Sequence, residues 1–190
     1  MAKPRILVFG GSIRTGAFSA RLAGLVAKEL MLLDAEPSLI SLSDYPMPLY
    51  DADHEARDGA PESARKLRRM MLAHRAVFIA TPEYNASLPP LLKNSLDWVS
   101  RAKEPAADPF KGRFFAIGST SNGRLGGYRA LMALRQTLEL GLGALVLPEQ
   151  VAVSEAATAF DESGALRDGR LGEFLRAGLR RLIAFAESEL

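Results

Sequence analysis

The sequence predicts an α/β fold in which a doubly wound sheet of five parallel strands lies between two layers of helices. Short apolar runs alternate with segments of helical periodicity along the 190 residues. Right-handed crossovers leave few topologies at this length, and the strand order 2-1-3-4-5 is the natural one. Hydrophobic residues make up 48% of the chain, so residues 1–190 are expected to form a single domain.

The five predicted strands are short runs of apolar and β-branched residues. They are expected at residues 6–10, 38–41, 76–80, 114–118 and 144–147. Pro148 stands directly after the fifth run and is expected to end that strand.

The predicted helices have apolar residues every three or four positions. They are expected at residues 19–31, 61–74, 91–101, 126–140 and 171–187. The last helix has a predicted core face made of Leu171, Phe174, Leu175, Leu179, Leu182 and Phe185. Residues 42–59 are predicted to be a long irregular loop, because prolines and acidic residues interrupt any period.

Composition excludes several classes of function. The net charge is only +2 and the charges are interspersed, so no nucleic-acid partner is expected despite a pI of about 9.0. The absence of cysteine excludes disulfides, thiolate catalysis and sulfur-ligated metals. The N-terminal apolar run is too short for a signal peptide or a membrane span, which predicts a soluble, cytoplasmic protein with no membrane partner.

Polar and glycine-rich segments follow the first, third and fourth predicted strands. In the predicted order these strands are neighbours, so their three loops meet beyond the carboxyl ends of the sheet, where this fold binds ligands.

The first loop, residues 10–19, places hydroxyls and a guanidinium at a helix start, which attracts anions. Gly11 and Gly16 fit the first part of a P-loop, but Ala17 stands where that motif needs lysine. Ser12 breaks the dinucleotide fingerprint GxGxxG. Two interpretations remain: a cradle for a phosphomonoester, or an ordinary helix capped by its own serine and threonine.

The second loop begins the segment TPEYNASLPPLLKNSLDW, in which two prolines start a helix. The loop offers backbone amides, the Tyr84 ring and the Asn85 amide, but no strong nucleophile. These groups suit a flat polar ligand that is held rather than attacked. The structural alternative is a turn in which Pro82 fixes the backbone and Asn85 caps the helix.

The third loop, residues 119–127, ends in the pair Gly126 and Gly127. Paired glycines allow the backbone to approach a planar ring closely. The alternative is a flexible loop that only starts a helix.

Other catalytic or metal chemistry has little support in the sequence. His54 and His74 lie outside the three loops, and His74 is expected to cap a helix end through its charge. The acidic residues near 51–58 are expected to be solvated rather than to bind a metal. No GxSxG motif supports a serine hydrolase.

Four segments together resemble the NADPH-dependent FMN reductase family of flavodoxin-like enzymes, which includes bacterial quinone, azo-dye and chromate reductases. The segments are GSIRTGAFS, PLYDADHE, TPEYNASLPPLLKNSLDW and GSTSNGRLGGYRALMALRQ, and the resemblance extends from about residue 6 to residue 150. The resemblance implies bound FMN, hydride transfer from NADPH or NADH through flavin N5, a quinone, azo, chromate or free-flavin acceptor, and dimers or tetramers.

The same resemblance implies the residues that surround the cofactor. The FMN phosphate is expected among Ser12, Arg14, Phe18 and Ser19, the flavin ring and ribityl chain along Pro82, Glu83, Tyr84 and Asn85, and the other side of the ring against Ser121, Gly126 and Gly127. No catalytic side chain and no metal ligand is expected. Arg14 is the preferred phosphate ligand, because its charge is permanent.

The chain departs from the family pattern at two positions of the first loop. Ala17 replaces the usual serine and Ser19 replaces the usual asparagine. One lost hydrogen bond to a charged group is expected to weaken FMN binding about ten- to a hundredfold. A flavin or nucleotide carrier or sensor without turnover is therefore the alternative function.

The helix at 91–101 carries more apolar residues than one sheet face needs. Leu92, Leu96, Trp98 and Val99 are therefore candidates for a dimer interface, unless Trp98 packs inside its own chain.

Overall fold

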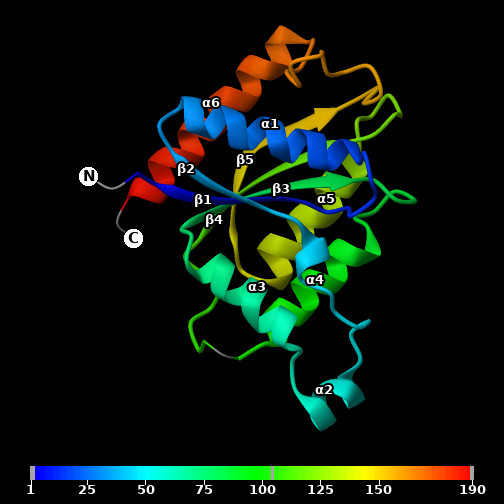
Figure 1. The fold of residues 1–190 in the computed structure, drawn as a ribbon, viewed down its shortest axis with the longest axis vertical. Helices are drawn as coiled ribbons and strands as arrows, with labels where there is room; N and C mark the ends of the chain where they lie inside the picture. The colour runs from blue at the N-terminus through cyan, green and yellow to red at the C-terminus, as the bar shows by residue number, and fades with distance from the viewer. Residues whose placement is uncertain (1–2, 104, 189–190) are drawn as a thin grey trace.

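The computed structural model describes residues 3–103 and 105–188 and contains one sheet of five parallel strands (Figure 1). The strands are β1 (Arg5–Gly10), β2 (Glu36–Ile40), β3 (Ala76–Pro82), β4 (Phe114–Thr120) and β5 (Leu145–Val153). Their order is β2-β1-β3-β4-β5, which confirms the predicted topology.

Helices cover both faces of this sheet and give the three predicted layers (Figure 1). One face packs against α1 (Phe18–Leu32) and α6 (Gly169–Glu187). The other face packs against α3 (Glu62–Leu72), α4 (Pro90–Arg101) and α5 (Tyr128–Gln136). The described residues include no helix long and apolar enough to cross a bilayer.

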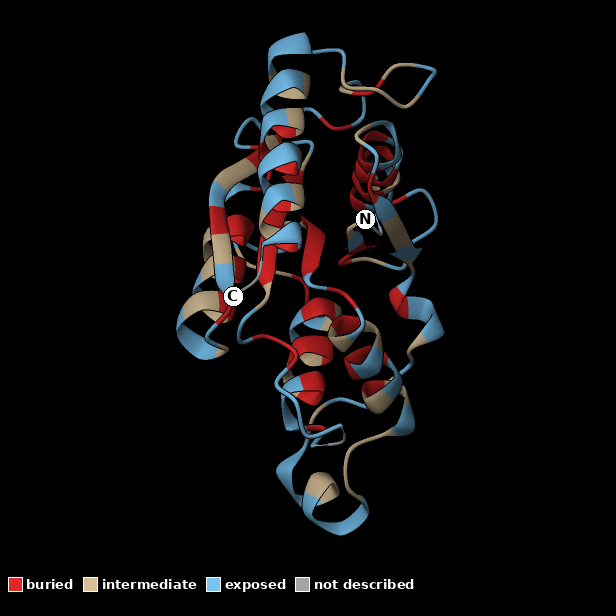
Figure 2. Cartoon of the chain, turned by 90° about the vertical axis from the view of Figure 1, so that its left-hand side faces the viewer, coloured by how far each residue is buried: buried red, intermediate tan, exposed pale blue. Residues whose placement is uncertain are grey.

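The core consists of two apolar layers that share the strands. Ile6 and Val8 point toward α1 and α6, whereas Leu7 and Phe9 point toward the opposite helices. Because both faces are covered, β4 is buried at every residue, and β1 and β3 are buried at all but one end residue each (red in Figure 2).

β5 continues past Pro148 to Val153, so the predicted end of this strand was wrong. Val146 pairs with Phe115 and Gln150 pairs with Ile117, which leaves residues 147–149 opposite a single residue of β4. Such a bulge on an edge strand accommodates proline, because the missing amide hydrogen interrupts no central ladder.

Residues 42–59 are not a wholly irregular loop, as the sequence had predicted. They contain a short 3₁₀ turn, η1 (Leu42–Asp44), and a helix, α2 (Ala52–Asp58). The Asp51 side chain caps α2 by accepting a hydrogen bond of 2.9 Å from the Asp53 amide. α2 projects from the body of the molecule and buries none of its residues (Figure 1).

Two helices in the structure differ in detail from the prediction. Phe174, placed on the core face of α6, is 45% exposed. The helix predicted over 126–140 is α5 followed by a π-helical turn, η2 (Thr137–Gly141), where the Thr137 hydroxyl donates to the Ala133 carbonyl at 2.8 Å.

The apolar residues of α4 are not available for a dimer interface. Leu92, Leu96, Trp98 and Val99 are each at most 2% exposed within the single chain. Trp98 packs inside, donates its indole hydrogen to the Pro48 carbonyl at 2.8 Å and lies edge-on to Tyr50. The proposed interface on these side chains was wrong, and the packing alternative for Trp98 is confirmed.

Candidate functional site

The loops after β1, β3 and β4 lie side by side at the carboxyl rim of the sheet. β3 pairs with β1 and with β4, and the last pairs along these ladders are Gly10 with Ala80 and Pro82 with Thr120. The structure therefore brings together the three segments that the sequence singled out.

The first loop leaves the start of α1 without a side-chain cap. Ala17 occupies the N-cap position, and the first turn carries no acidic residue. Ser12 instead accepts a hydrogen bond from the Arg14 amide at 3.3 Å, within the loop. The alternative of an ordinary helix capped by its own serine or threonine is thus wrong, and the amide hydrogens at this positive helix end face the rim.

Ser19 contributes a buried hydroxyl to the first turn of α1. The residue is 0% exposed, and its Oγ has no hydrogen-bond partner in the part of the chain that the structure describes. A buried hydroxyl without a partner is costly. Arg14 is exposed, and Phe18 is half-buried beside Ser19.

The second loop forms a tight two-residue turn. The Tyr84 and Ser87 backbones exchange two hydrogen bonds of 3.0 Å, and Asn85 and Ala86 both have positive φ, 48° and 66°. This is the pattern of a type I′ turn. Asn85 therefore does not cap α4, whose N-cap is Pro89, and that alternative was wrong. Tyr84 and Asn85 are exposed at the tip.

Glu83 uses its carboxylate within the chain. It accepts hydrogen bonds from the Arg129 amide at 3.1 Å and from Arg129 Nε at 2.9 Å, and it also binds Nη2 of the same guanidinium. The Glu83 side chain is only 7% exposed. Because the Arg129 amide belongs to the first turn of α5, Glu83 caps this helix from the neighbouring loop.

The glycine pair of the third loop is required by internal packing. Gly126 and Gly127 have φ of 61° and 85°. A Cβ on Gly126 would lie 2.8 Å from the Ala152 carbonyl carbon, and one on Gly127 would lie 2.9 Å from Ser119 Cβ. The close approach that these glycines permit is thus to β5 and β4. Ser121 is half-buried and accepts from the Gly123 amide at 3.1 Å.

Thr120 is a rim residue that the sequence-based reasoning missed. Its buried Oγ1 has no hydrogen-bond partner among the described residues. Side chains alternate along β4, so Thr120 shares the sheet face of Phe114 and Ala116, which is the face that α1 covers. The available signal was a hydroxyl residue at the end of a buried strand. Arg129 was also missed, because no local pattern links it to Glu83.

A cavity of about 300 Å³ lies between the first two loops. Gly11, Ser12, Ile13 and Arg14 form one wall, and Tyr84 with residues 89–91 forms the other. Apolar walls with one guanidinium suit a flat ring system that carries an anionic tail.

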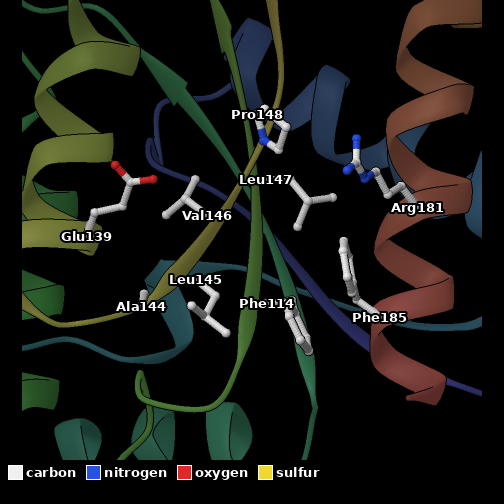
Figure 3. A pocket seen from close by; sticks show the side chains of 9 residues that line it. All are labelled: Phe114, Glu139, Ala144, Leu145, Val146, Leu147, Pro148, Arg181 and Phe185. Carbon is white, nitrogen blue, oxygen red and sulfur yellow. The ribbon is translucent and has the colours of Figure 1, made fainter. Parts of the chain in front are cut away.

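A separate cavity of about 320 Å³ lies away from the rim, beside the first residues of β5 (Figure 3). Its floor contains Phe114 and Phe185, whose rings stack at 4.8 Å. The charged groups at its edges are already paired, Arg181 with Glu149 and Glu139 with Arg135. Because this cavity adjoins the first residues of β5, it lies outside the site that the loops form at the carboxyl ends of the strands.

Neither histidine belongs to the rim. His74 is buried, and its Nδ1 donates to the Met70 carbonyl at 2.6 Å while Nε2 lies 2.7 Å from the Ser38 hydroxyl. Burial lowers the pKa of His74, so the predicted charged cap was wrong and a neutral ring ends α3 by hydrogen bonding. His54 lies on α2 against Trp98. In residues 3–103 and 105–188, no three acidic or histidine side chains gather as a metal site.

The family of the chain follows from comparison with known sequences. A model of the NADPH-dependent FMN reductase family matches residues 4–158, a range that contains all three loops. The chain belongs to this family. The match confirms the resemblance that the loop motifs had indicated.

Individual relatives agree with the family match. An NAD(P)H-dependent FMN reductase of Pseudomonas aeruginosa is 37% identical over 180 residues, covering 94% of this chain and 92% of its own. A quinone reductase of Escherichia coli is 36% identical over 139 residues, covering 72% of this chain and 70% of its own.

Solved structures of flavoenzymes share the fold. A flavoenzyme NAD(P)H:(acceptor) oxidoreductase of Paracoccus denitrificans superimposes with a TM-score of 0.80 and 26% identity, and the match covers 97% of both chains. This FMN reductase family member thus shares its flavodoxin-like architecture with a flavoenzyme along nearly its whole length.

Proposed function

We propose that this chain binds FMN at the carboxyl rim of its sheet and transfers electrons from NAD(P)H to a quinone or another small acceptor. Relatives named as FMN and quinone reductases support the activity. The observation that carries the assignment to this rim is the uncapped start of α1 with the buried, unpartnered hydroxyl of Ser19 beside it.

The first loop fits a phosphate group. The amides at the α1 start and the Arg14 guanidinium supply donors, and a phosphate oxygen would give the Ser19 hydroxyl the acceptor that it lacks. We assign Ser12, Arg14, Phe18 and Ser19 to the phosphate. Ser12 is already 3.3 Å from the Arg14 amide, so the loop is partly ordered before binding.

The second and third loops suit the ring of the cofactor. Pro82, Tyr84 and Asn85 are assigned to the ring and ribityl chain, and Tyr84 lines the cavity of about 300 Å³. Glu83 contributes its backbone, because its carboxylate is bound to Arg129. Ser121 and the backbone of Gly126 and Gly127 are assigned to the opposite side of the ring.

The chemistry needs little from side chains. Bound FMN would supply the redox chemistry, accepting hydride from the nicotinamide and passing electrons to the acceptor. The amides of Glu83 and Asn85 would hold and orient the ring edge and stabilise negative charge there, since the Tyr84 amide already donates to the Ser87 carbonyl. Glu83 is the only carboxylate among residues 81–89, and both of its oxygens are already bound to Arg129. No catalytic side chain is assigned.

Removal of the Arg14 charge tests the phosphate assignment. We expect Arg14→Ala to raise the Kd for FMN about ten- to a hundredfold, because a charged hydrogen bond is lost. The Kd for riboflavin, which has no phosphate, should stay unchanged. Arg180→Ala, at an exposed position on α6, is the control.

The measurement is visible absorbance retained after FMN loading and gel filtration, with titration of the Kd. Equal FMN affinity in wild type and Arg14→Ala would contradict the assignment of the phosphate to the first loop. Anaerobic NADPH or NADH should bleach the bound flavin, whereas a persistently yellow protein would indicate a carrier without turnover.

Further predictions concern the oligomeric state, the cellular location and nucleic-acid binding. Self-association into a dimer or tetramer, a cytoplasmic location and the absence of a nucleic-acid partner stay predictions from the sequence. The apolar residues of α4 are excluded as the surface for self-association, because their own chain buries them.

A further inference from the structure

A second cavity opens on the other side of the first loop. It measures about 400 Å³ and lies between the start of α1 and the end of β2. Ser12 lines this cavity and also the one of about 300 Å³ assigned to the flavin. The first loop therefore separates two adjoining cavities at the same rim.

The lining of this second cavity is apolar on one side and polar on the other. Ala20 and Ala23 of α1 and Leu39 of β2 form the apolar side, and Leu39 is 53% exposed. Ser41 and Asp44, which follow β2, add a hydroxyl and a carboxylate.

Asp44 brings an uncompensated negative charge to this cavity. Its carboxylate has the Ser43 hydroxyl at 3.5 Å as a neighbour, and no cationic side chain of the described residues lies within 4.0 Å of it. Arg14, on the same loop as Ser12, bonds to the Thr15 carbonyl instead. The cavity thus disfavours anionic groups near Asp44 and favours groups that donate hydrogen bonds.

This combination matches the adenosine part of a reduced nicotinamide dinucleotide. Adenine can lie against the apolar side, and the two ribose hydroxyls can donate to the carboxylate. Dinucleotide-binding folds with a glycine-rich first loop, which this chain lacks, use an acidic residue beyond the second strand for the ribose 2′-hydroxyl of NAD, and Asp44 has the same place in the order of elements. NADPH carries a 2′-phosphate at that position, and the negative charge of Asp44 would repel it.

We propose that this cavity binds the adenosine of NADH, and that Asp44 makes the chain prefer NADH to NADPH. The proposal rests on the proposed function, because the nicotinamide must reach the flavin. β2 and β3 are two strand spacings apart, on the order of 10 Å, so one dinucleotide spans both cavities. Asp44 acts as a specificity residue and takes no part in hydride transfer.

Binding of ADP-ribose, which lacks the nicotinamide, tests the cavity without turnover. Calorimetry on FMN-loaded protein should show ADP-ribose binding at least tenfold more tightly than its 2′-phosphate. Asp44→Asn should weaken ADP-ribose about tenfold and leave the 2′-phosphate unchanged or tighter, because a neutral amide no longer repels it. Asp53→Asn, an exposed position on α2, should change neither affinity.

Reduction kinetics give the second measurement. The ratio of flavin reduction rates with limiting NADH and NADPH should favour NADH in the wild type and fall about tenfold in Asp44→Asn. Asp44 is exposed, so the variant is expected to fold, and its melting temperature checks this.

The outcomes separate the two proposals. Equal affinity of the wild type for both ligands, or the same preference in Asp44→Asn, would overturn the adenosine assignment even if the flavin is reduced. If ADP-ribose binds in an Asp44-dependent way but NADH does not reduce the flavin, the adenosine site would be supported and the proposed reductase activity would be refuted.

Discussion

Glu83 connects two of the three loops that make the site. Its carboxylate lies on the loop after β3, and its hydrogen bonds reach the backbone and side chain of Arg129 at the start of α5. The Glu83 side chain is buried and the Arg129 side chain is 57% exposed, so the pair is only partly screened by water. We infer that the pair sets the separation of the second and third loops.

Removing this carboxylate should loosen both loops. We expect Glu83→Ala to lower the free energy of unfolding by about 1–2 kcal/mol, because α5 loses its cap and Arg129 its partner. The Kd for FMN should rise as well. Glu83→Gln keeps an oxygen for the Arg129 amide and should lose less. Urea unfolding and FMN titration measure both effects.

An exposed ion pair provides the matched control. Glu173 pairs with Arg176 on the surface of α6 and is 70% exposed, so Glu173→Ala should cost at most about 0.5 kcal/mol. If Glu83→Ala were no more destabilising than Glu173→Ala, the carboxylate would not hold the loops together.

Single residues were only partly predictable from the sequence. The positions of Ser12, Arg14 and Ser19 at a helix start follow from local pattern, because glycines and hydroxyls mark such turns. The partner of Glu83 lies 46 residues away, and no local pattern shows it. The packing of Gly126 against β5 was equally hidden, since the register of β5 depends on a bulge.

At the scale of elements, His74 joins the end of α3 to β2. Its ring donates to the Met70 carbonyl of α3 and accepts from Ser38 of β2. This arrangement needs the neutral ring with the proton on Nδ1, because a carbonyl can only accept. A second proton on Nε2 would force the Ser38 hydroxyl to turn away.

Acid should therefore weaken the fold through His74. Burial lowers the folded-state pKa of this ring, whereas the unfolded chain takes up a proton near pH 6.5. The stabilising contribution is complete above about pH 6.5 and is lost as pH falls toward the folded-state pKa. His74→Gln should flatten this part of the pH dependence, measured as urea unfolding at pH 7.5 and 5.5.

His54 gives an internal comparison for this experiment. It lies half-buried on α2 and makes neither of the His74 contacts, so His54→Gln is the matched control. An unchanged slope in His74→Gln would show that this ring does not carry the pH dependence.

Elements with strong periodicity were predicted well. The errors concern elements whose existence or end depends on the tertiary structure. The apolar positions Leu22, Val26 and Leu30 of α1 are all 0% exposed, as their spacing predicts. α2 was missed because none of its residues is buried, so no apolar stripe marks it. β5 passes Pro148 because an edge strand tolerates a bulge, which the sequence alone does not reveal.

At the scale of the whole molecule, the strand order decides where the loops meet. The order β2-β1-β3-β4-β5 places the ends of β1, β3 and β4 next to one another, and it was predictable from alternation and crossover handedness. The two cavities at that rim were not predictable, because their size and lining depend on how side chains pack, between residues 11–14 and 84–91 in one case and between α1 and the end of β2 in the other. Their placement on either side of the first loop is the basis for a flavin site and an adjoining dinucleotide site.

A crystal structure of the FMN complex would show whether the cofactor binds at the three loops. We expect electron density for the phosphate at the start of α1, within hydrogen-bond distance of Arg14 and Ser19, and for the ring along Tyr84 and Asn85. Flavin density at any other surface, or a phosphate turned away from the first loop, would contradict it.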